Sequence, residues 1–282
     1  MKHHYVPQFL LSKWAGENAY KTLEIFRLDL HELISDRHTP KYTGYEDNLY
    51  ALTVPHVAGM DMHDNEELFF KKIDDKASKV LGAMEVRGIK ALTADERSHW
   101  ALFLMSLSVR HPSVIFEIIS KKTANLLRES LRNNPFDYES SRQNHEPETF
   151  VEWTKGKFPE FIENFGISGL SEFVDSPVCL QQICNMRWWL WDFTGAKHDL
   201  LLGDNPLILS AKIDDPNLIF ALLISPTKAF MATQSDRVAA SLRTQEINCL
   251  AIQLNESSVM RSGSRIYAQN KKHWRFIENR KF

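Results

Sequence analysis

The order of the sequence patterns along the chain constrains the fold more than any other feature. Helical patterns occupy the middle of the 282 residues, whereas strand-forming segments gather towards both ends. Helices and strands that are segregated in this way are typical of α+β proteins, because α/β folds alternate the two. We therefore expect a mainly helical α+β fold, with an antiparallel sheet formed largely by the C-terminal half and a hairpin near the N-terminus.

The predicted strands are short apolar runs bounded by turn residues. An N-terminal hairpin is expected because two extended runs are separated only by a polar break at residues 29–31. In the C-terminal half, turn signals such as Thr194-Gly195 and Ser225-Pro226 separate several strand candidates. The predicted strands are 23–28 and 32–35 in the hairpin, and 187–193, 199–202, 218–224 and 228–232 in the C-terminal half.

The central helices carry recognisable start and stop signals. Thr93 and Glu96 form a capping box, and Pro112 should end that helix at Arg110-His111. Apolar residues at helical spacing predict a helix before it, and a last long helix should start after Ser235. The other expected helices cover about 7–15, 64–87, 113–132, 149–165 with an interruption at Pro159, and 170–184 with an interruption at Pro177. The last long helix runs to about residue 254.

Composition sets limits on the number of domains and on partners. Hydrophobic residues make up 43% of the chain, enough for one large core, so we expect a single domain over 1–282. The polar segment 133–147 could be a flexible insertion in it or a linker between two domains. The net charge of -2 gives no general electrostatic reason for a nucleic-acid or membrane partner, although it leaves room for a local basic groove. No apolar segment follows Met1-Lys2-His3-His4, so a cytoplasmic protein is expected.

Three polar residues are candidates for a common site, although glycine-rich phosphate loops, paired cysteines and metalloprotease motifs are absent. His4 precedes the first helix and could act as a general base or metal ligand, or simply pack against that helix. Asp204 follows an apolar strand, where it could bind a metal or orient a base, although Asp-Asn-Pro is also an ordinary turn. Arg110 could clamp a phosphate or carboxylate, or favour the helix dipole.

Several strings together resemble a known bacterial family. His4-Tyr5-Val6-Pro7-Gln8-Phe9, Arg110-His111-Pro112, the strand with Trp189 followed by Gly203-Asp204-Asn205-Pro206, and Arg265-Ile266-Tyr267 are similar to elements of the family designated domain of unknown function 4238. That designation confers no activity. The resemblance implies only the positions of interest, which are His4, Gln8, Arg110, Asp204 and Asn205.

Two hypotheses from different classes follow. In the first, the protein is a phosphodiester hydrolase of the nuclease kind, such as a toxin or phage-defence effector, with His4, Asp204 and Arg110 as the catalytic groups. Gln8, Asn205 and Glu67 are its candidate substrate-binding residues, although Glu67 also stabilises the dipole of its own helix. A divalent metal ion is a candidate cofactor, and nucleic acid or another phosphate-bearing ligand a candidate partner.

In the second hypothesis, the protein is non-catalytic and recognises a small anion or a protein partner. Geometry separates the two. Side chains of His4, Asp204 and Arg110 that meet in one hollow would favour the enzyme, whereas His4 buried against its own helix would favour the binding protein.

Overall fold

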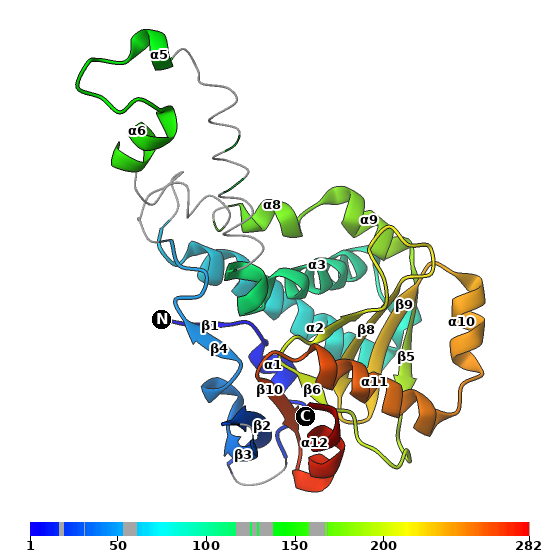
Figure 1. The fold of residues 1–282 in the computed structure, drawn as a ribbon. Coiled ribbons are helices and arrows are strands. Elements are labelled where there is room, and N and C mark those ends of the chain that lie inside the picture. Colours follow the sequence, from blue (N-terminus) through cyan, green and yellow to red (C-terminus); the bar gives the residue numbers. More distant parts are fainter. Residues whose placement is uncertain are drawn as a thin grey trace. The chain divides into compact units, whose positions relative to one another are not determined.

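The structure is a computed structural model that describes residues 1–16, 20–30, 32–52, 61–116, 125, 129, 138–157, 167 and 169–281 (Figure 1). It confirms the mainly helical α+β class with antiparallel sheets. The chain separates into two compact units, which are described one at a time. The first comprises Met1–His3, Glu46–Lys72 and Pro112–Asp175, and the second comprises His4–Tyr45, Ile73–His111 and Ser176–Phe282.

The first unit is mostly helical where it is described. The π-helical turn η3 (Asn65–Phe70) belongs to this unit, and the short helix α8 (Leu170–Val174) packs against it. The next helix, α2 (Lys71–Arg87), has its first two residues in this unit and the rest in the second. His3 is buried and accepts a hydrogen bond from the Tyr50 backbone amide at 2.9 Å, while its other ring nitrogen lies 3.2 Å from His63. The remaining described helices of this unit are α5 (Tyr138–Ser141) and α6 (Phe150–Lys157).

The second unit contains two four-stranded antiparallel sheets. The first has the order β3-β2-β10-β6, and β2 and β3 form the N-terminal hairpin that the sequence predicts. The second has the order β5-β9-β8-β7 and lies entirely in the C-terminal half. The strands of the first sheet are β2 (Leu23–Asp29), β3 (Glu32–His38), β6 (Leu202–Gly203) and β10 (Arg265–Ala268); those of the second are β5 (Arg187–Asp192), β7 (Leu207–Leu209), β8 (Ile219–Ser225) and β9 (Lys228–Thr233). Outside these sheets, β1 (Lys2–His4) pairs with β4 (Tyr45–Asp47).

Helices pack against each of these two sheets through apolar side chains. Trp100 of helix α3 (Ala94–Arg110) packs against Phe230 of β9, with ring centroids 5.5 Å apart. The helices α11 (Ile247–Arg261) and α12 (Trp274–Lys281) are drawn in orange and red in Figure 1. They share a core with the first sheet, in which Phe26, Val259, Ile266 and Ile277 are buried. The other helical elements of this unit are α1 (Gln8–Leu11), η1 (Pro40–Tyr42), η4 (Ile89–Ala91), α9 (Pro177–Asn185), α10 (Asp236–Arg243) and η6 (Lys271–His273).

Most element predictions are confirmed, and three need correction. The last long helix is in fact two, α10 and α11, because the Glu246 side chain accepts the Cys249 backbone amide at 3.0 Å and starts a new helix there. Only Leu202 of the predicted strand 199–202 pairs in a sheet, and the predicted first helix, 7–15, is shortened to Gln8–Leu11. The predicted helix 113–132, the end of 149–165 and the start of the segment 133–147 lie largely outside the described residues.

In the part of the chain that the structure describes, no helix has both the length and the apolar character that crossing a bilayer requires.

Candidate functional site

The turn after β6 places Asp204 inside the second unit. Gly203 lies against α11, where its backbone amide donates to the Ser258 hydroxyl at 2.7 Å. A Cβ at this position would sit 2.6 Å from the Ser258 carbonyl oxygen, so only glycine allows this approach. The close packing carries the next residue, Asp204, under the loop that joins α11 to β10, where its side chain is fully buried.

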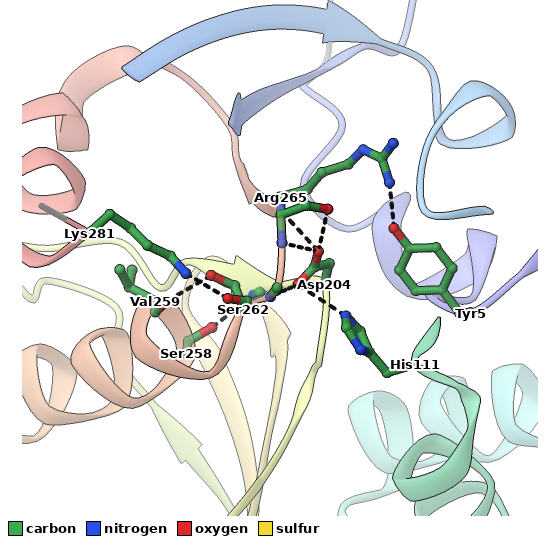
Figure 2. Close-up of polar contacts among 11 residues, drawn as sticks. Tyr5, His111, Asp204, Ser258, Val259, Ser262, Arg265 and Lys281 are labelled. Atoms are coloured by element: carbon green, nitrogen blue, oxygen red, sulfur yellow. Dashed lines mark hydrogen bonds and ion pairs between the residues drawn. The ribbon is translucent and has the colours of Figure 1, made fainter. Parts of the chain in front are cut away.

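The carboxylate of Asp204 is held by three consecutive backbone amides of that loop (Figure 2). The Gly263 amide donates to Oδ1 at 2.7 Å, and the amides of Ser264 and Arg265 donate to Oδ2 at 2.8 and 2.9 Å. The Ser264 hydroxyl donates to Oδ2 as well, at 3.0 Å. Successive amides that converge on an anion form a nest, so the fold positions this carboxylate rigidly.

Burial and hydrogen bonding act on the pKa of Asp204 in opposite directions. Burial alone would raise this pKa, because it disfavours the charged form. The nearby His111 imidazole, 3.7 Å away, and hydrogen bonds from the amides of Ser264 and Arg265 outweigh burial and lower the pKa below its ordinary value. Asp204 is therefore a carboxylate near neutral pH, despite having no exposed surface.

His111 approaches the same carboxylate from the end of α3. Pro112 disfavours helical conformation in the residue before it, and His111 accordingly leaves the helix with an extended backbone. Its Nε2 lies 3.7 Å from Oδ1 of Asp204, and its ring meets that of Tyr5 edge to face at 5.7 Å. A Cβ on Gly263 would come within 2.8 Å of the imidazole, so the loop glycine leaves room for this ring. The result is a histidine beside a fixed buried carboxylate, with Tyr5 on another side (Figure 2).

Arg265 brings a cation to the same place. Its guanidinium Nη1 donates to the Tyr5 hydroxyl at 2.5 Å, and its side chain is half-buried. Within the described residues this guanidinium has the Tyr5 hydroxyl as its one hydrogen-bond partner, so most of its donors are unused. On the other side of the loop, the Lys281 ammonium donates to the Ser262 carbonyl oxygen at 2.5 Å and holds the end of α11. Gly263 and Ser264 are exposed, so this polar cluster reaches the surface.

The structure does not place His4 and Arg110 in hydrogen-bonding contact with Asp204. His4 is buried against its own helix, with its Nδ1 3.4 Å from the Gln8 amide nitrogen and its ring 5.5 Å from that of Tyr45. Arg110 is fully buried and pairs with Asp74 of α2, Nη1 to Oδ1 at 2.8 Å. A guanidinium in this position has no surface to offer a phosphate, so the clamp role predicted for Arg110 does not fit its place.

The three predicted substrate-binding residues occupy different places in the fold. Asn205 follows Asp204 directly and is half-buried, and Gln8 is exposed on α1. Glu67 is exposed in η3 and belongs to the first unit.

Sequence reasoning missed the residues that surround Asp204. His111, Tyr5 and Arg265 all lie inside the strings that resemble the family, but Arg110 and His4 were predicted as the chemical groups of those strings. Within the described ranges, no group of three or more His, Cys, Asp or Glu side chains is arranged to hold a metal ion. A metal at Asp204 and His111 would therefore need further ligands from water or substrate.

Comparison with known proteins identifies a family. The model of a family described as "Protein of unknown function (DUF4238)" matches residues 2–272, nearly the whole chain. Searches of curated proteins and of solved structures gave no match. The chemistry must therefore be argued from the side chains around Asp204.

Proposed function

This chain belongs to the DUF4238 family, whose description assigns no activity, and we propose from the site itself that it is a hydrolase of phosphodiester bonds. One observation carries the proposal. The imidazole of His111 lies beside the fixed carboxylate of Asp204, and the half-buried guanidinium of Arg265, which has unused donors, bonds Tyr5, whose ring meets that imidazole. A base and a cation beside an orienting acid suit a reaction in which negative charge develops on phosphate oxygens.

Each group has a distinct role in this proposal. His111 removes a proton from the attacking water, whose oxygen forms the new bond to phosphorus. Asp204 fixes the ring and stabilises the imidazolium that results, as buried carboxylates do for catalytic histidines. Arg265 binds the non-bridging phosphate oxygens, and the leaving oxygen takes its proton from solvent as its bond to phosphorus breaks. The 3.7 Å separation of His111 and Asp204 is compatible with this role, since catalytic hydrogen bonds often tighten only when substrate binds.

A second candidate is a non-catalytic protein that binds a small anion at the same place. The burial of His4 against α1 favours it, as does the engagement of both Asp204 oxygens by backbone amides. In that case Asp204 would only hold the loop between α11 and β10 in place, and Arg265 and His111 would bind the anion without catalysing a reaction.

Hydrolysis and binding can be measured on the same protein. We would incubate the full chain with RNA, single-stranded DNA and duplex DNA, with and without Mg²⁺ or Mn²⁺. The variant His111→Asn should lower kcat by a factor of about 10² to 10⁴, the usual contribution of a general base. Arg265→Lys should mainly raise KM, because lysine cannot bind phosphate oxygens in bidentate fashion.

His99→Asn is the matched control, because His99 also stands on α3 beside an aspartate, with its Nδ1 3.3 Å from Asp95. Activity should be unchanged in this variant, since the partners of His99 in the described structure are Asp95 and Lys76, and neither belongs to the cluster around Asp204. Cleavage that persists at the wild-type rate in His111→Asn would refute the assignment. Phosphate-dependent binding without cleavage of any substrate would support the second candidate.

A further inference from the structure

A hollow of about 650 Å³ opens beside α1 in the second unit. Gln8 and Ser12 line it from the α1 side, and Thr39 with Lys41 lines it from η1, which packs against α1. Lys21 completes the described wall. A volume in this range is typical of ligand pockets and would admit a few nucleotides of one strand rather than a duplex.

The charge of this hollow is positive. Lys21 and Lys41 are exposed, and they are the charged side chains among the lining residues that the structure describes. Within the residues that the structure describes, neither lysine forms an ion pair with a carboxylate. Two unneutralised ammonium groups on a chain with a net charge of -2 indicate a local preference for anions.

Each of these lysines is directly preceded or followed by an exposed tyrosine. Tyr20 is 80% exposed and Tyr42 is 55% exposed, both unusually high for aromatic side chains. The ammonium of Lys41 lies 5.9 Å from the centre of the Tyr42 ring. Cations that alternate with exposed aromatic rings are typical of surfaces that bind single-stranded nucleic acid, where the rings stack on bases and the cations contact phosphates.

The hollow is connected to the polar cluster around Asp204 by one short segment of chain. Tyr5, which accepts the Arg265 hydrogen bond, begins this segment, and its backbone amide donates to the Gly44 carbonyl oxygen at 3.0 Å. Three residues later Gln8 lines the hollow, and its side-chain nitrogen lies 3.4 Å from His4. Three residues of chain span at most about 11 Å, so Tyr5 at Arg265 and Gln8 at the hollow lie within a few nucleotides of each other.

We propose that this hollow binds the backbone of a single-stranded nucleic acid on either side of the phosphodiester at Arg265, with Tyr20 and Tyr42 stacking on bases. This inference rests on the proposed function for its choice of substrate class, but it concerns binding rather than bond cleavage. It makes the preferred substrate an oligonucleotide rather than a mononucleotide or a small diester.

The test measures binding of fluorescein-labelled 12-nucleotide DNA and RNA to the full chain by anisotropy over a range of salt concentrations. Lys21→Gln with Lys41→Gln should weaken binding about tenfold. The slope of log K against log[salt] should fall in magnitude by about 1.4, which is about 0.7 for each single-strand phosphate that is no longer neutralised. Tyr20→Leu with Tyr42→Leu should weaken binding at least about fivefold with little change in that slope, because stacking is uncharged.

The matched control is Lys90→Gln with Lys212→Gln, which removes two lysines outside the hollow. An equal loss of affinity in this control and in the Lys21/Lys41 variant would overturn the inference, and so would wild-type affinity in the Lys21/Lys41 variant or a wild-type chain that binds neither DNA nor RNA.

Hydrolysis of bis(4-nitrophenyl) phosphate, which is too small to reach the hollow, separates this inference from the proposed function. Cleavage of that diester without oligonucleotide binding would support the proposed hydrolase activity and refute nucleic-acid binding in the hollow. Lysine-dependent binding without any cleavage would support binding in the hollow and refute the hydrolase activity.

Discussion

Two aspartates of the second unit, the partly buried Asp74 and the fully buried Asp204, are partnered by consecutive residues of the chain. Arg110 pairs with Asp74, and the next residue, His111, lies beside Asp204. Burial raises the pKa of Asp74 from an ordinary value of 3.8 to about 6, although the Arg110 guanidinium lowers it. The pKa of Asp204 is instead lowered, even though its side chain is the less exposed of the two.

The difference shows that hydrogen-bond donors decide the charge state of a buried carboxylate more than a single cation does. Asp204 receives three backbone amides and a hydroxyl, whereas the guanidinium of Arg110 is the partner found for the Asp74 carboxylate in the described structure. Backbone amides are already fixed by the fold, so they stabilise charge without ordering a long side chain. Arg110 is itself desolvated at full burial, and that cost offsets much of its attraction for Asp74.

The largest effect is expected when the Arg110–Asp74 pair is broken. Arg110→Met should lower the free energy of unfolding by about 3–4 kcal/mol at pH 7, because it leaves the Asp74 carboxylate, which is only 22% exposed, without its cation. Urea denaturation followed by circular dichroism measures this decrease. Arg110→Met combined with Asp74→Leu should recover most of the stability, since a packed apolar pair needs no desolvation of charge. If the double variant were as unstable as the single one, the pairing would not be the source of the decrease.

A smaller decrease is expected at Asp204. Asp204→Asn should lower the free energy of unfolding by about 2–3 kcal/mol, because the amide keeps one acceptor oxygen but turns an NH₂ group towards backbone donors. The same urea titration checks it. Asp215→Asn is the control, since Asp215 accepts one backbone amide, that of Asn217 at 2.7 Å, in an exposed turn. Its effect on the free energy of unfolding should stay within about 0.5 kcal/mol. An equal decrease in both variants would mean that the hydrogen bonds to Asp204 stabilise the fold no more than the single bond to Asp215.

The two aspartates should also respond to pH with opposite signs. The pKa of Asp204 is lowered in the folded state, so its contribution to stability is complete above about pH 4 and disappears as the pH falls through the folded value. The pKa of Asp74 is raised to about 6, so its contribution is complete below about pH 4 and disappears as the pH rises towards 6.

Unfolding free energies of the wild type, Asp204→Asn and Asp74→Asn, measured from about pH 3 to about pH 7, test these signs. Relative to the wild type, Asp204→Asn should become less harmful as the pH falls below about 4, and Asp74→Asn less harmful as it rises from about 4 to 6. Parallel curves for the two variants would contradict the assigned directions.

Features of the fold that depend on residues close together in the chain could be predicted from the sequence, whereas features that depend on contacts between distant segments could not. The capping box of Thr93 and Glu96 and the helix end before Pro112 are local signals, and both are where the sequence predicts them. The break at Glu246 was missed because glutamate is not a preferred cap residue, although its carboxylate accepts the Cys249 amide here.

The surroundings of Asp204 depend on contacts between distant segments. The sequence marks Asp204 as the end of a strand, but nothing local states that the amides of 263–265 will receive it. The choice between Arg110 and His111 as its neighbour depends on how α3 is rotated against α2, which is a matter of tertiary packing. The prediction of Arg110 as a site residue, together with His4 and Asp204, therefore marked the right end of α3, although the neighbouring His111 is the residue beside Asp204.

The smallest effect is expected at Gly263, and it separates the contribution of His111 from that of the backbone amides. An added Cβ would lie 2.8 Å from Cε1 and 2.9 Å from Nε2 of His111, so Gly263→Ala should push the imidazole away from Asp204 while leaving the loop amides in place. The free energy of unfolding should fall by about 1 kcal/mol, at the low end for overpacking, because only one methyl group is added. The loss of stability at acidic pH should begin at a higher pH, since one of the groups that lower the pKa of Asp204 has moved.

Gly82→Ala is the control, because its Cβ would meet nothing within 4 Å and alanine favours the helix. If Gly263→Ala leaves the stability at acidic pH unchanged, the backbone amides alone keep Asp204 charged. The contact would then not contribute to the lowered pKa of Asp204.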